Sequence, residues 1–196
     1  MKEIRIHARA GQGAITTARI LAMAAFEQGK YALAFPHFGA ERMGAPMNAF
    51  VRLDSQKIYL RSRVHTPDYI LVVDPSLAIA EEFGVFQGLK AEGAAIVNFA
   101  GEAEKFAGRT EASIWTVPAS EIAMEFLGQD RANMPLLGTF AAVTGEIELP
   151  ALEKAIVQNF GEGRIASKNV EAVRRAYELV LRTKDSVLSP ALSAQS

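Results

Sequence analysis

The feature that most restricts the fold of this chain is a turn with two glycines between a short strand and a helix near the N-terminus. Residues 3–8 (EIRIHA) alternate apolar and polar side chains, which predicts a strand. Residues 14–30 (AITTARILAMAAFEQGK) are predicted to form a largely apolar helix. Between them lies RAGQGA, where Gly11 and Gly13 permit a sharp turn. A strand that enters a helix through such a turn is typical of α/β folds.

Strands and helices continue to alternate along the chain, and this order predicts an α/β fold. We expect a Rossmann-like three-layer sandwich with a mixed, mainly parallel sheet. Residues 47–54 and 57–61 read as a hairpin inserted into that sheet. Residues 1–185 are predicted to form one domain, and residues 186–196 a C-terminal tail without regular structure. The other predicted strands are 31–35, 68–74, 94–100 and 113–118, and the other predicted helices are 76–83, 119–128, 134–145, 149–160 and 168–182.

The composition excludes several classes of function. The 196 residues carry a formal net charge of −1 and include no cysteine. The chain therefore has no general affinity for nucleic acid and cannot form disulfides, thiolate zinc sites or cysteine-ligated iron–sulfur clusters by itself. We expect a cytoplasmic protein without a secretion signal or membrane span. No metal site is predicted, because His7, His37 and His65 are far apart in the sequence.

The RAGQGA turn is the first candidate site. A helix N-terminus with exposed backbone N–H groups suits a phosphate, and Gly11 and Gly13 let a ligand approach closely. The dinucleotide pattern is incomplete, because Thr16 stands at its third glycine and no carboxylate follows the second strand before Glu41. A nicotinamide dinucleotide is therefore disfavoured, and a turn without a ligand is the alternative. Arg9 and Gln12 are further candidates for contact with a ligand or another chain.

The loop of residues 36–46 (PHFGAERMGAP) is the second candidate site. It follows the second strand, at the edge of an open α/β sheet where ligands bind. Glu41 and Arg42 are its charged residues, and a role in binding is favoured over catalysis. A charged surface loop is the alternative. No catalytic residue is predicted, since the chain shows neither a G-x-S-x-G motif nor an acid–base constellation.

Taken together, several stretches resemble the gamma subunit, or gamma domain, of the 2-oxoacid:ferredoxin oxidoreductases. The resemblance extends from about residue 3 to residue 182 and is carried by GQGAITTARILAMAAFEQGKYALAFPHFGAERMGAP, DYILVVDPSL, NMPLLGTFAAVTG and KNVEAVRRAYE. It implies an oligomeric enzyme that oxidatively decarboxylates a 2-oxoacid with thiamine diphosphate and Mg²⁺. It also implies electron transfer through four-iron, four-sulfur clusters and acyl transfer to coenzyme A. Alpha, beta and ferredoxin-like delta subunits would be the partners and would hold these cofactors.

The resemblance implies that this chain is a non-catalytic gamma subunit that shapes coenzyme A access and subunit contacts. The GAERMGAP sequence is closer to pyruvate and ketoisovalerate oxidoreductases than to 2-oxoglutarate enzymes. The identity of the 2-oxoacid and of the electron acceptor stays open. A pure scaffold subunit and a free-standing nucleotide-binding oxidoreductase are the alternatives. The residues expected to face coenzyme A or another subunit are Arg9, Gly11, Gln12, Gly13, Glu41 and Arg42.

Overall fold

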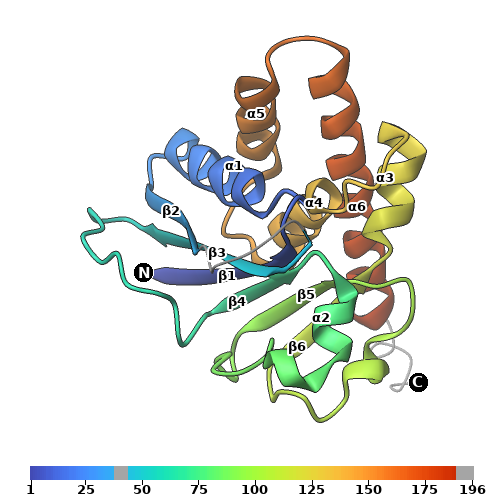
Figure 1. The fold of residues 1–196 in the computed structure, drawn as a ribbon. Helices are drawn as coiled ribbons and strands as arrows, with labels where there is room; N and C mark the ends of the chain where they lie inside the picture. The colour runs from blue at the N-terminus through green and yellow to red at the C-terminus, as the bar shows by residue number, and fades with distance from the viewer. Residues whose placement is uncertain (38–43, 189–196) are drawn as a thin grey trace, which may run out of the picture.

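The computed structural model describes residues 1–37 and 44–188, and these residues form an α/β fold, as predicted (Figure 1). The strands are β1 (Lys2–Arg9), β2 (Tyr31–His37), β3 (Pro46–Asp54), β4 (Tyr69–Val72), β5 (Ala94–Asn98) and β6 (Ser113–Val117). The helices are α1 (Ala14–Glu27), α2 (Pro75–Ile79), α3 (Ala119–Leu127), α4 (Asn133–Thr144), α5 (Leu149–Phe160) and α6 (Arg164–Leu188), with the 3₁₀ turns η1 (Glu81–Phe83) and η2 (Ala103–Phe106).

The six strands form one mixed sheet in the order β2-β3-β1-β4-β5-β6. The pairs β1–β4, β4–β5 and β5–β6 are parallel, whereas β3 is antiparallel to both β1 and β2. This confirms a mixed, mainly parallel sheet. Pro36 lies within β2, where it is tolerated because β2 is an edge strand.

The predicted hairpin between residues 47–54 and 57–61 is wrong. Residues 47–54 belong to β3, but residues 57–61 form no strand. Both edges of β3 are already paired, with β1 on one side and β2 on the other, so no edge is left for residues 57–61. The antiparallel hairpin of the sheet is formed by β2 and β3 instead. Local alternation predicted strand-like residues correctly for β3 but could not identify its partners.

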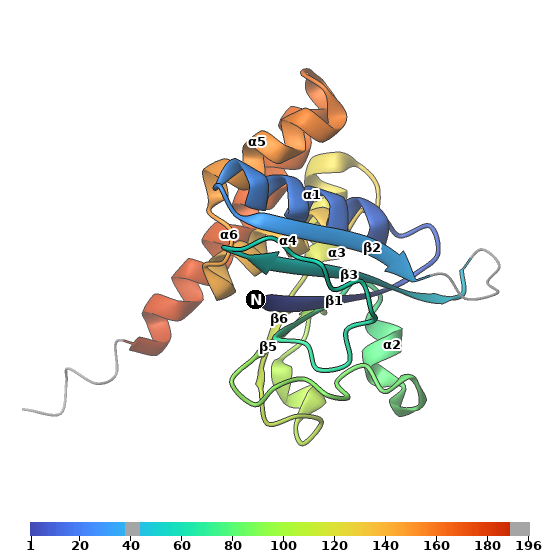
Figure 2. The same cartoon turned by 90° about the vertical axis from the view of Figure 1, so that its left-hand side faces the viewer.

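The sheet separates two hydrophobic clusters. Residues of α1 and α3–α6 pack with alternate residues of the strands, such as Ile4 and Ile6 of β1, in the larger cluster. The smaller cluster lies on the other face, where α2 packs on β4 and β5. Figure 2 shows α1 and α5 on one side of the sheet and α2 on the other. This arrangement confirms the predicted sandwich, although Ile15 and Phe26 of the apolar helix α1 stay largely exposed.

The last helix is longer than predicted. α6 begins at Arg164 and ends at Leu188, so it includes residues 186–188 of the segment predicted as an irregular tail. Residues 189–196 lie outside the described residues. Within residues 1–37 and 44–188, no helix is both long enough and apolar enough to cross a bilayer.

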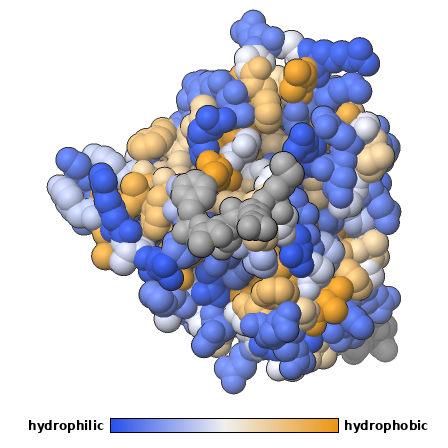
Figure 3. Space-filling view, viewed as in Figure 1, coloured by the Kyte–Doolittle hydropathy of each residue, from blue (hydrophilic) through white to orange (hydrophobic). Residues whose placement is uncertain are grey.

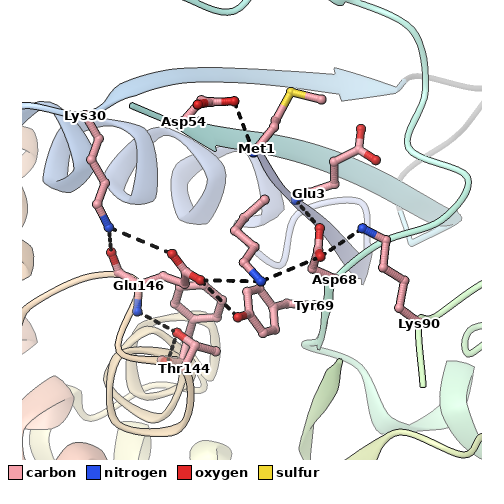
Figure 4. Close-up of polar contacts among 11 residues, drawn as sticks. Met1, Glu3, Lys30, Asp54, Asp68, Tyr69, Lys90, Thr144 and Glu146 are labelled. Atoms are coloured by element: carbon pink, nitrogen blue, oxygen red, sulfur yellow. Dashed lines mark hydrogen bonds and ion pairs between the residues drawn. The ribbon is translucent and has the colours of Figure 1, made fainter. Parts of the chain in front are cut away.

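A network of charged groups lies at the end of the sheet where strands β1 and β4 begin (Figure 4). The Asp68 carboxylate accepts hydrogen bonds from Lys90 Nζ at 2.9 Å and from the backbone N–H of Glu3 at 2.8 Å. Tyr69 donates to Glu146 at 3.0 Å, and the N-terminal amino group lies 3.1 Å from the Asp54 carboxylate. The acidic groups at this end of the sheet are therefore paired within the chain.

Candidate functional site

Both glycines of the turn between β1 and α1 have backbone conformations that favour glycine. The φ angles are +98° at Gly11 and +85° at Gly13. Gly13 is the N-cap of α1, and a Cβ built on it would lie 2.8 Å from Nδ2 of Asn133. Asn133 begins α4, so the turn packs directly against the start of a second helix. The positive φ angles account for glycine at both positions, whereas ligand or subunit contact at this turn stays a prediction.

The side chain of Gln12 forms two hydrogen bonds that hold the turn in place. Its Oε1 accepts a hydrogen bond from the backbone N–H of Arg9 at 2.7 Å. Its Nε2 donates to Oδ2 of Asp74 at 2.8 Å. Asp74 lies just after β4, the strand next to β1, so the glutamine joins the ends of two parallel strands.

Arg9 also binds this carboxylate. Its Nε lies 3.3 Å from Oδ2 of Asp74, and its Nη2 donates to Oγ of Ser76 at 3.0 Å. Partial burial by itself would raise the pKa of Asp74. Hydrogen bonds from Ser76 and Gln12 and the charge of Arg9 outweigh that effect and hold the pKa of Asp74 below its ordinary value. Asp74 is therefore an ionised partner for two of the predicted site residues.

Sequence reasoning did not identify Asp74 as a site residue. An Asp-Pro pair directly after a buried strand was the available signal, because aspartate is a frequent N-cap and proline a frequent first helical residue. Asp74 does cap α2, since it accepts a hydrogen bond from the backbone N–H of Ser76 at 3.0 Å.

Two of the predicted site residues, Glu41 and Arg42, lie outside the described residues. The residues that follow them do reach the glycine turn. The backbone N–H of Ala10 donates to the carbonyl of Ala45 at 2.9 Å, and the N–H of Gly44 donates to the carbonyl of Ala10 at 3.3 Å. The second candidate loop therefore re-enters the sheet beside the first candidate site.

A cationic cavity of about 260 Å³ lies on one side of the turn, between α1, α4 and α6. Arg131 and Lys168 are its charged residues, and it has no acidic residue in its wall. Neither cation forms an ion pair with another described residue. The N-termini of α1 and α4 have no side-chain cap and no acid in their first turns, so their dipoles add positive potential. The remaining lining residues are Gly13, Thr16, Leu127, Gln129, Asn133, Met134, Phe160, Ile165 and Asn169.

An acidic cavity of about 210 Å³ lies on the other side of the turn, at the carboxyl ends of the parallel strands. Asp74 and Asp130 are its charged residues, and Asn98 and Ser120 add polar groups. Residues 129–132 contribute alternately to the two cavities. Gln129 and Arg131 line the cationic one, whereas Asp130 and Ala132 line the acidic one. This short segment and the glycine turn thus separate regions of opposite charge.

Burial holds the histidine of β1 in its neutral form. His7 is buried in β1, and burial together with the charge of Arg5 lowers the pKa of this histidine to about 3. It is neutral at physiological pH and accepts a hydrogen bond from Arg5 at 2.9 Å. In residues 1–37 and 44–188, no group of three or more His, Cys, Asp or Glu side chains is placed to hold a metal ion.

Comparison with known proteins gives the family context of this site. Residues 3–179 match the family described as pyruvate ferredoxin/flavodoxin oxidoreductase. The chain is 47% identical to the pyruvate synthase subunit PorC of Methanothermobacter thermautotrophicus over 178 residues, which are 91% of this chain and 95% of that protein. It is 43% identical to the pyruvate/ketoisovalerate oxidoreductases common subunit gamma of Pyrococcus furiosus over 181 residues, 91% of this chain and 96% of that one.

A solved structure supports the same relationship. The pyruvate oxidoreductase subunit PORC of Thermotoga maritima superposes with a TM-score of 0.80 at 37% identity, covering 90% of this chain and 95% of that chain. The mixed sheet and its helices are therefore shared with that protein.

Proposed function

The chain belongs to the pyruvate ferredoxin/flavodoxin oxidoreductase family, and we propose that it is the gamma subunit of a complex that oxidatively decarboxylates a 2-oxoacid. In this proposal the complex transfers the acyl group to coenzyme A and passes electrons through iron–sulfur clusters to ferredoxin or another acceptor. The names of the relatives favour pyruvate or ketoisovalerate as the 2-oxoacid. Alpha, beta and ferredoxin-like delta subunits are the proposed partners.

The side chains of this chain do not fit an iron–sulfur cluster, because the sequence contains no cysteine thiolate. The clusters are therefore assigned to the partner subunits. Thiamine diphosphate and its Mg²⁺ are assigned to them as well, as the family resemblance implies. The gamma subunit contributes binding and positioning in this scheme, and none of its residues is proposed to be catalytic.

The cationic cavity beside the glycine turn carries the functional part of the proposal. Coenzyme A is a polyanion with three phosphate groups, and this cavity presents Arg131, Lys168 and two uncapped helix N-termini. At about 260 Å³ the cavity is smaller than a typical site for a whole cofactor. It suits one phosphate-bearing part of coenzyme A, with the rest of the molecule lying between subunits.

A pure scaffold subunit is the second candidate. It is favoured by one observation, namely that Arg9 and Gln12 already bind Asp74 inside the chain and form a self-contained turn. A free-standing nucleotide-binding oxidoreductase has less support. The acidic cavity containing Asp74 and Asp130 lies where such folds bind a dinucleotide, and its charge repels a pyrophosphate.

Charge-neutralising variants in the assembled complex test the proposal. We expect Arg131→Gln and Lys168→Gln each to raise the KM for coenzyme A by about 10- to 100-fold, since a charge-assisted hydrogen bond contributes ~1.5–3 kcal/mol. The KM for the 2-oxoacid should stay unchanged. Arg182→Gln is the matched control, because Arg182 is exposed on α6 and does not line the cavity.

Arg42→Ala extends the test to the second candidate loop. It should raise the KM for coenzyme A while leaving the melting temperature unchanged. An unchanged KM in all three cavity and loop variants, combined with weaker assembly, would instead support the scaffold. Turnover of a 2-oxoacid by the isolated chain would support the free-standing enzyme.

A further inference from the structure

A projecting basic segment follows β3 and takes no part in the site described above. Residues 57–63 (KIYLRSR) form neither helix nor strand. Figure 1 shows the loop that follows β3 on the side of the molecule away from α3 and α6. Tyr59 is 78% exposed and Leu60 is 48% exposed, while Lys57, Arg61 and Arg63 are also exposed. The corresponding side of the molecule is mostly hydrophilic in Figure 3. A large aromatic side chain among three cations therefore faces solvent.

The backbone of this segment is held by a buried arginine. Arg52 of β3 is 1% exposed, and its Nη1 donates to the carbonyl of Leu60 at 3.0 Å. Its Nε donates to the Glu3 carboxylate at 2.7 Å, which balances the charge. After the segment, Val64 is only 3% exposed and anchors the chain in the protein. The core thus fixes the backbone so that the side chains of Tyr59, Leu60 and Arg61 point outward.

The charge of the segment is not neutralised within the described part of the chain. Lys57, Arg61 and Arg63 form no ion pair with a described residue, and Lys57 lies 5.5 Å from the centre of the Tyr59 ring. Two acids linked to this part of the chain are engaged elsewhere, namely Asp54 at the end of β3 and Glu3, which pairs with Arg52. Asp54 binds the N-terminal amino group, as Figure 4 shows.

We propose that residues 57–63 dock onto an acidic protein surface of another subunit of the complex. The proposal rests on the proposed function in requiring such a complex. Tyrosine and arginine are enriched at the centres of protein interfaces, and an arginine fork pairs with a carboxylate through two hydrogen bonds. A fixed backbone lowers the entropy lost on binding. A protein surface fits better than nucleic acid, because the chain has a net charge of −1 and this segment offers only three cations.

Zero-length carbodiimide coupling of the purified complex tests the contact directly. The reagent joins an amine to a carboxylate only where the two groups touch, and Lys57 supplies the amine. We expect mass spectrometry to identify the Lys57 peptide coupled to an aspartate or glutamate of a different subunit. Coupling of Lys57 only within its own chain, or no coupling at all, would overturn the proposal.

Charge reversal tests the energetics. Arg61→Glu with Arg63→Glu should weaken binding of the partner subunit at least 10-fold at low ionic strength, with a smaller difference at high salt. Lys105→Glu with Arg19→Glu is the matched control, because it makes the same charge change at exposed positions without ion pairs to described residues. Equal assembly of both variants would overturn the docking proposal alone. A wild-type chain that co-purifies with no oxidoreductase subunit would overturn the proposed function. If the Arg61→Glu and Arg63→Glu variant loses a bound RNA but keeps its partner subunit, the docking proposal is also overturned.

Discussion

Alanine at Gly13 should destabilise the protein more than alanine at Gly11, although both glycines belong to the same turn. Both have positive φ angles, +85° and +98°, which an L side chain rarely adopts. Each substitution should therefore cost about 1–2 kcal/mol of backbone strain. The two positions differ in their surroundings. A Cβ at Gly11 has no heavy atom within 4 Å, whereas a Cβ at Gly13 lies 2.8 Å from Nδ2 of Asn133.

The additional cost at Gly13 comes from moving the side chain of Asn133. This asparagine is 3% exposed and its Nδ2 donates to Oγ1 of Thr17 at 3.3 Å. Displacing it breaks a buried hydrogen bond worth about 0.5–1.5 kcal/mol and disturbs packing in the wall of the cationic cavity. The total loss of unfolding free energy should be about 1–2 kcal/mol for Gly11→Ala and roughly 2–4 kcal/mol for Gly13→Ala.

Urea denaturation of the two variants measures the difference. A double-mutant cycle with Asn133→Ala isolates the steric part, because removing the asparagine amide should make Gly13→Ala about as mild as Gly11→Ala. Gly11→Ala should behave additively with Asn133→Ala. Equal losses for the two glycines, or no coupling between Gly13 and Asn133, would refute the reasoning that the turn packs tightly against α4.

Three further outcomes are expected. The pKa of His7 is about 3 in the folded protein and ~6.5 in the unfolded chain, so the unfolded state binds more protons between these two pH values. The free energy of unfolding should therefore fall by up to about 1.4 kcal/mol per pH unit as the pH drops below 6.5. In denaturation experiments at several pH values, His7→Gln should lose this pH dependence. Arg52→Met should lower the unfolding free energy by about 2–4 kcal/mol in urea, because it leaves the carbonyl of Leu60 and the Glu3 carboxylate without their partner. We propose that residues 186–196 bind a partner subunit through their apolar residues Val187, Leu188 and Leu192. Their deletion should weaken binding to the partner subunits without lowering the melting temperature by more than a few degrees, and equal binding by the truncated chain would contradict this role.

The sequence predicted the features of this fold that depend on local patterns. The glycine turn, the helices and most strands follow from periodicity and from residues at their ends. The position of β3 could not be predicted, because its insertion between β1 and β2 depends on pairing between distant residues. Residues 57–61 alternate like a strand, yet they stay outside the sheet since β3 has no free edge.

The site was predictable only in its local part. Gly11, Gln12 and Gly13 were identified from their place between a strand and a helix. Their partners come from far along the chain, since Asp74 is 62 positions from Gln12 and Asn133 is 116 positions from Thr17. The cationic cavity likewise combines α1 with residues of α4 and α6. No local pattern predicts that Arg131 and Lys168 meet beside the turn, because tertiary packing alone brings them together.

Asp74 explains why this turn departs from a dinucleotide site. In nucleotide-binding α/β folds, the crevice between the first strand and its parallel neighbour receives a pyrophosphate. Here the ionised carboxylate of Asp74 already occupies that crevice. It accepts a hydrogen bond from Gln12 and forms an ion pair with Arg9. A phosphate entering there would lie beside a like charge, at a cost that rises as water is excluded. The opposite side of the turn has Arg131, Lys168 and no carboxylate. An anionic ligand of this protein is therefore expected in the cationic cavity that contains Arg131 and Lys168. It is not expected in the acidic cavity at the carboxyl ends of the parallel strands.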